Sequence, residues 1–103
     1  MKLKKIENSS LFKDLQDPNF AASYLEEMLL EDNLNDFLIA LRNVSKANGG
    51  ITSLAESTQL GRESLYKTLS EQGNPYFLTI NTIIKNLGFK IAIEVDCNKE
   101  EAA

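Results

Sequence analysis

Apolar residues recur at helical spacing through most of the chain, and this pattern predicts a mainly α fold. Asp17 and Pro18 have the residue types of a helix start, an N-cap followed by proline at the first helical position. The spacing that follows predicts a helix over about 18–30 and a second helix that ends before the Asn-Gly-Gly at 48–50. We expect the apolar residues of both helices to lie in the core, among them Leu29 and Leu34.

Two short helical patterns separated by a three-residue turn make up the middle of the chain. The first pattern ends near Thr58, and the second runs from Arg62 to about Ser70, with Gln-Leu-Gly at 59–61 between them. A small residue, Ala55, stands where the two helices would have to approach closely. This arrangement is typical of a helix-turn-helix.

The last third of the chain changes its period. We expect a final helix after Asn74-Pro75, with Thr79 as its N-cap and Gly88 as its end. Beyond it every second residue is apolar, namely Phe89, Ile91, Ile93 and Val95. This alternation predicts a C-terminal β-strand. The N-terminal arm is the one nearby segment that could pair with it, and a lone strand leaves its backbone unpaired. We expect these four residues to pair with the same strand of a second copy, which would generate a two-fold dimer.

These elements predict one domain, a bundle of five helices with a C-terminal β-strand. We expect four parts along the chain: an N-terminal arm over 1–16, a helix-turn-helix domain over 17–88, a dimerisation strand over 89–96 and a disordered tail over 97–103.

Composition limits the chemistry. The 103 residues include no apolar run long enough for a membrane helix, the N-terminus lacks a signal-peptide pattern, and Cys97 is the single cysteine. We therefore expect a cytoplasmic protein. Histidine is absent, which removes histidine relays and ordinary zinc sites, and no glycine-rich phosphate loop is present. We expect no enzyme activity, no cofactor and no metal.

The charge is distributed unevenly. The net charge is −4, yet residues 42–90 carry six basic residues against three acidic ones, and residues 1–41 carry four basic residues against eight acidic ones. A local basic surface, more than the total charge, decides whether phosphate is attracted. The middle of the chain is therefore the candidate for binding nucleic acid.

The second short helix offers donors and acceptors suited to base edges. Arg62 and Lys67 can donate to guanine or phosphate, Glu63 can accept from cytosine, and Tyr66 can contact a thymine methyl group. One arginine and one lysine on a helix are also common on ordinary surfaces. The pattern alone leaves open whether this helix-turn-helix binds DNA.

The run GGITSLAESTQLGRESLYKTLSEQGNP, continuing into LTINTIIKNLGFKIAIEV, resembles the small addiction-module antidote proteins, the antitoxins of bacterial toxin–antitoxin pairs. The similarity extends upstream through DPNFAASYLEEML and NDFLIALRNV and covers roughly residues 17–96. The resemblance implies a lambda-repressor-like bundle with a Cro-type helix-turn-helix. It also implies a dimer that binds double-stranded operator DNA, represses its own operon and neutralises a toxin encoded beside it. Family members often have serine at the position of Gly61.

Carried onto this sequence, the resemblance assigns base reading to Arg62, Glu63, Tyr66 and Lys67. The candidates for phosphate contacts are Thr52, Ser53, Ser64, Ser70 and Asn74. Toxins of such pairs are often basic, RNA-cleaving proteins, which makes the acidic residues of 7–36 candidates for toxin binding: Glu7, Asp14, Asp17, Glu26, Glu27, Glu31, Asp32 and Asp36. Two alternatives remain, a repressor without a toxin partner and a protein-interaction module that does not bind DNA.

Overall fold

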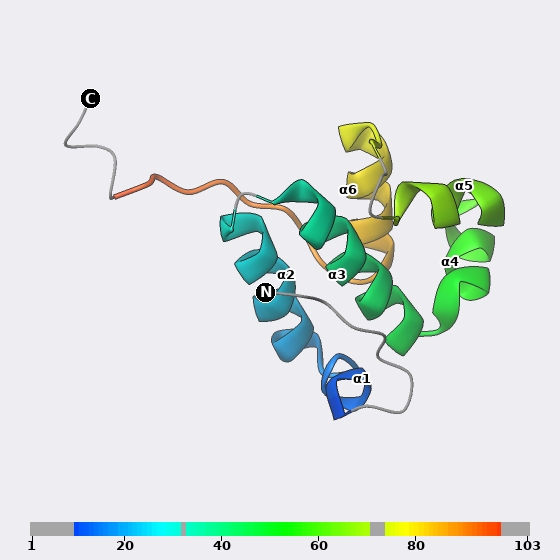
Figure 1. Cartoon of the computed structure of the whole chain (residues 1–103), viewed down its shortest axis with the longest axis horizontal. Helices are drawn as coiled ribbons and strands as arrows, with labels where there is room; N and C mark the ends of the chain where they lie inside the picture. The colour runs from blue at the N-terminus through cyan, green and yellow to red at the C-terminus, as the bar shows by residue number, and fades with distance from the viewer. Residues whose placement is uncertain (1–9, 32, 71–73, 98–103) are drawn as a thin grey trace.

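A computed structural model describes residues 10–31, 33–70 and 74–97, and six α-helices lie in these ranges (Figure 1). They are α1 (Ser10–Asp14), α2 (Pro18–Leu30), α3 (Leu34–Ala47), α4 (Gly50–Thr58), α5 (Arg62–Thr68) and α6 (Phe77–Asn86). Helix α3 packs against α1, α2 and α4, and α4 packs in turn against α5 and α6. The mainly α character is confirmed, but the expected number of five helices is too low.

The predicted bounds of α2 and the predicted end of α3 are confirmed, because local capping signals set them. Asp17 caps α2, and its carboxylate accepts a hydrogen bond from the backbone N–H of Asn19 at 3.0 Å. Helix α3 ends at Ala47, where the chain enters two glycines in the left-handed region, Gly49 with φ of 105° and Gly50 with φ of 84°. A residue with a Cβ would be strained at either position, so this pair sets the sharp entry into α4.

Helix α6 begins earlier than predicted and ends as predicted. It starts at Phe77, with Tyr76 as its N-cap, so Thr79 lies inside the helix and does not cap it. At the other end Gly88 has φ of 95°, and its N–H donates to the carbonyl of Lys85 while the N–H of Phe89 donates to that of Ile84. This pair of bonds is a Schellman motif, which needs a left-handed residue at the position that glycine occupies.

The core lies around α3. Leu38, Ala40, Leu41 and Val44 are completely buried, and the other helices contribute their inner faces to the same cluster. A polar link ties α2 to α3, since the side-chain amide of Asn43 donates to the Tyr24 hydroxyl at 3.2 Å. Burial raises the pKa of Tyr24, and the hydrogen bond from Asn43 offsets part of that rise.

Part of the expected N-terminal arm belongs to the fold. Helix α1 packs on α3, and Leu15 after it is completely buried. The side-chain amide of Asn48 donates to the backbone carbonyl of Leu15 at 2.9 Å. Residues 1–9 lie outside the described residues, and the boundaries of the arm stay a prediction.

The predicted C-terminal β-strand is wrong. Residues 89–96 run on from α6 without regular secondary structure, and the described part of the chain contains no strand to pair with them. Alternation in a sequence determines which side chains share a face, but a strand also needs a neighbour for its backbone hydrogen bonds. Of the expected tail over 97–103, only Cys97 is among the described residues.

None of the helices in residues 10–31, 33–70 and 74–97 combines the length and the apolar character needed to cross a membrane.

Candidate nucleic-acid interface

Helices α4 and α5 are joined by a turn over residues 59–61, as the sequence predicts. Gln59 holds the left-handed conformation, with φ of 63° and ψ of 18°, and its N–H donates to the carbonyl of Ala55 at 2.9 Å. The Thr58 hydroxyl donates to the carbonyl of Leu54 at 2.7 Å and accepts from the N–H of Leu60 at 3.3 Å. These bonds satisfy backbone groups at the end of α4 and fix the direction in which α5 leaves.

Helix α5 is held by two side chains that point inward. Leu65 and Leu69 are completely buried, whereas Leu60 in the turn is half-buried against the same core. Gly61 is the N-cap of α5 and has no side chain that could cap it, although its carbonyl accepts from the N–H of Leu65 at 2.9 Å. A helix of seven residues is too short to be stable alone, so its orientation depends on these buried leucines.

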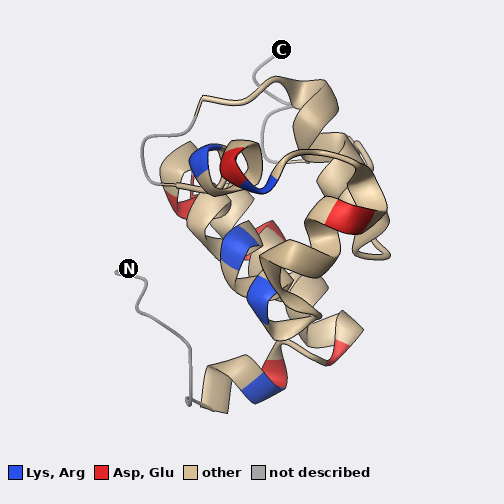
Figure 2. Cartoon of the chain, turned by 90° about the vertical axis from the view of Figure 1, so that its right-hand side faces the viewer, with Lys and Arg blue, Asp and Glu red and all other residues tan. Residues whose placement is uncertain are grey.

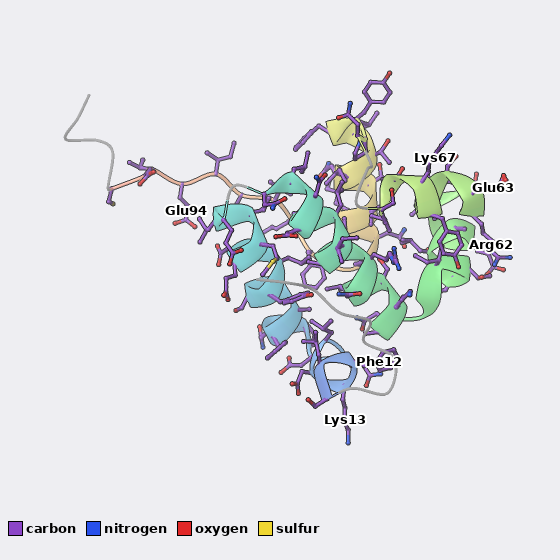
Figure 3. All side chains as sticks on the ribbon, viewed as in Figure 1. Phe12, Lys13, Arg62, Glu63, Lys67 and Glu94 are labelled. Atoms are coloured by element: carbon purple, nitrogen blue, oxygen red, sulfur yellow. The ribbon has the colours of Figure 1, made fainter. Side chains whose placement is uncertain are left out.

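The opposite face of α5 is exposed. Arg62, Glu63, Tyr66 and Lys67 are all exposed, and their spacing of one, three and one residues places them on one side of the helix. Figure 3 shows Arg62, Glu63 and Lys67 projecting away from the body of the molecule. Figure 2 faces the side that carries α4 and α5, and it shows two basic positions on α5 with an acidic position between them.

The candidate phosphate ligands are less uniform. Thr52 and Ser53 are exposed in the first turn of α4, and Ser64 on α5 and Asn74 in the following loop are also exposed. Ser70 is half-buried, and its hydroxyl donates to the carbonyl of Lys67 at 2.8 Å. The hydroxyl of Ser70 is thus engaged within the chain, whereas the hydroxyls at the start of α4 stand beside a helix N-terminus without a side-chain cap.

A side-chain bond fastens α4 to α6. The Ser57 hydroxyl donates to the side-chain oxygen of Asn86 at 2.6 Å, across 29 positions of sequence. Since α4 also packs on α3, the first helix of the pair is supported on two sides. The face of α5 is therefore carried by a fixed helix and not by a free loop.

Sequence reasoning missed two groups of exposed apolar residues. Tyr76, Phe77 and Leu78 are 84%, 69% and 74% exposed at the start of α6. Leu29, Leu30 and Leu34, where α2 meets α3, are 52%, 78% and 53% exposed, so the expectation that Leu29 and Leu34 lie in the core is wrong. The sequence did hold a sign of this exposure. Each group places more apolar residues next to one another than a single buried helix face can hold, so some of them have to lie at the surface.

Comparisons with known proteins identify the family to which this chain belongs. A family model described as "Probable addiction module antidote protein" matches residues 5–95. The chain belongs to this family. It is also similar to an uncharacterised protein of Haemophilus influenzae, with 37% identity over 71 residues that cover 69% of this chain and 72% of the relative. No solved structure matches the chain.

Proposed function

We propose that this chain is an antitoxin that binds operator DNA as a dimer through α4 and α5, which form a helix-turn-helix, and neutralises a partner toxin. Membership of the antidote family supports the antitoxin role. The observation that carries the DNA-binding part is the exposed polar face of α5 on a helix anchored by buried Leu65 and Leu69. A major groove accepts a helix presented in this way.

In this proposal each exposed side chain of α5 contacts a different chemical group of the DNA. Arg62 donates to the acceptors of a guanine or to a phosphate, and Lys67 supplies a second positive charge. Glu63 accepts from a cytosine amino group, and Tyr66 contacts a thymine methyl group or a phosphate. Thr52, Ser53, Ser64 and Asn74 position the protein on the backbone, and Ser70 does so only after its bond to Lys67 is exchanged.

A dimer would present two copies of α5 to one face of the duplex. Recognition helices of such dimers lie about one DNA turn apart, roughly 34 Å. The segment over 89–96 supplies the apolar surface for this contact, since Ile91, Ile93 and Val95 are 39%, 96% and 75% exposed. Phe89 is half-buried against the core and holds the start of the segment. A second copy that covers these side chains removes apolar surface from water.

The experiment is a DNA-binding titration with the promoter fragment upstream of the gene, over a series of salt concentrations. Lys67→Ala and Arg62→Ala should each weaken binding by about 1–3 kcal/mol, and Lys67→Ala should also lower the dependence on salt by about one ion. Lys13→Ala is the matched control, because Lys13 is exposed on α1 and points away from α5 (Figure 3).

The outcomes separate the alternatives. Equal losses for Lys67→Ala and Lys13→Ala would mean that binding follows total charge and does not use α5. No binding at low salt by the intact chain would favour a protein-interaction module. Binding to DNA without binding to the protein encoded next to this chain would favour a repressor without a toxin.

A further inference from the structure

One long stretch of the chain carries acidic residues and no basic ones. Residues 14–41 hold seven aspartates and glutamates and no lysine, arginine or histidine. This stretch forms α2 and the first half of α3, and its acidic residues Glu26, Glu27 and Glu31 are exposed near the point where the two helices join.

Three exposed leucines lie at the end of α2 and the start of α3. Leu29, Leu30 and Leu34 fall within six residues of each other, and Leu30 is 78% exposed. Glu26 and Glu27 precede Leu30 by four and three residues, which places both carboxylates beside it on the surface of α2. We name the leucines and glutamates together the α2–α3 surface: Glu26, Glu27, Leu29, Leu30, Glu31 and Leu34.

The core does not require these leucines. Helix α2 already buries Ala21, Leu25 and Met28 on its inner face. A single exposed leucine is ordinary, but three close together with a polar rim are typical of a binding surface.

We infer that the α2–α3 surface docks a basic protein with an apolar pocket, which under the proposed function is the toxin. A second copy fits poorly, because a two-fold contact at this surface would set its glutamates against the same glutamates of the partner. Nucleic acid is repelled by the same charges. A basic protein gains from both the leucines and the carboxylates.

The location leaves the DNA-binding face free. In Figure 1 the junction of α2 and α3 lies on one side of the helical body and α5 lies on the other, with the rest of α3 and with α6 between them. The proposed toxin surface and the proposed DNA-binding face therefore lie on different sides of the chain, and neither includes a residue of the other.

The test is a calorimetric titration with the purified protein encoded by the neighbouring gene. Leu30→Ser should weaken binding about tenfold or more, because one leucine side chain loses its burial. Leu78→Ser is the matched control, since Leu78 is 74% exposed on α6, and it should leave the affinity unchanged. Glu27→Lys should weaken binding and reduce its dependence on salt, whereas Glu56→Lys, at an exposed position of α4, should do neither.

The possible results are distinguishable. If the intact chain binds the neighbouring protein and Leu30→Ser and Leu78→Ser bind equally well, the α2–α3 surface is wrong and the antitoxin function stands. If the intact chain does not bind that protein, the antitoxin function fails and this inference fails with it. If Leu30→Ser turns a dimer into a monomer in sedimentation, the surface is a contact between copies and the inference is overturned. DNA binding of Leu30→Ser should match that of the intact chain, which shows that the variant is folded.

Discussion

Gln59 occupies a backbone conformation that suits glycine, and this makes Gln59→Gly a sharp test of how the turn before α5 is built. The residue has φ of 63° and lies at the end of α4, where its N–H bonds to the carbonyl of Ala55. Its side chain is exposed, so its removal gives up little packing. The substitution therefore isolates the backbone term.

The magnitude follows from two opposing terms. A residue with a Cβ in the left-handed region is destabilised by about 1–2 kcal/mol, which glycine removes. Glycine loses about 0.5–1 kcal/mol more conformational entropy on folding than alanine. We expect Gln59→Gly to raise the free energy of unfolding by about 0.5–1 kcal/mol. For a domain of this size this corresponds to a rise in Tm of about 2–8 °C.

Thermal and urea unfolding followed by circular dichroism measure the effect, with Gln59→Ala as the matched control. Alanine removes the same exposed side chain but keeps the Cβ, so it should change stability by less than about 0.5 kcal/mol. If alanine stabilised the protein as much as glycine does, the gain would come from the side chain. If glycine destabilised the protein, the left-handed strain at this position would be refuted.

Three further substitutions test the core, a polar link and a cap. Leu65→Ala should lower the free energy of unfolding by about 2–5 kcal/mol in urea titrations, because Leu65 is completely buried, whereas Tyr66→Ala beside it should change it by less than about 1 kcal/mol. Tyr24→Phe should cost about 1 kcal/mol at neutral pH, because the Asn43 amide loses its acceptor. Because the pKa of Tyr24 is raised in the folded chain, the folded chain keeps the phenol proton at a pH where the unfolded chain begins to lose it. The free energy of unfolding of the intact chain should therefore fall as the pH rises above about 10. Tyr24→Phe should lack this contribution. Gly61→Ser should raise Tm, with a gain of about 0.5–1 kcal/mol, because its extended backbone suits a serine N-cap and a Cβ would meet no heavy atom closer than 3.9 Å.

Sequence reasoning succeeded where a boundary is decided by a few neighbouring residues. The start of α2 at Asp17, the end of α3 before Gly49 and the end of α6 at Gly88 each depend on a cap or a left-handed residue within one turn. The inward positions of Leu65 and Leu69 also follow from local spacing alone. Signals of this range are readable without knowledge of the fold.

Sequence reasoning failed where the outcome depends on a distant partner. The alternation over 89–96 indicates an extended segment, but only a neighbouring strand would turn that segment into a β-strand. Leu29 and Leu34 continue an apolar pattern, yet α2 and α3 fill the space between them with other side chains and leave these two at the surface. Exposure of this kind depends on how helices pack and not on their individual spacing.

The distribution of charge is compatible with the proposed binding of DNA by an acidic chain. In Figure 1 the junction of α2 and α3, where the exposed glutamates of the α2–α3 surface lie, is separated from α5 by the rest of α3 and by α6. Each helix with its side chains is about 10 Å wide, and the Debye length is about 8 Å at physiological ionic strength. In the proposed complex, DNA at α5 would meet the local charges of Arg62 and Lys67, while salt would screen most of the repulsion from the acidic side. The same separation leaves the charge of α2 open to the basic partner proposed above. The net charge of −4 comes from the two ends of the chain, since residues 1–41 sum to −4 and residues 91–103 to −3, while residues 42–90, which include α5, sum to +3.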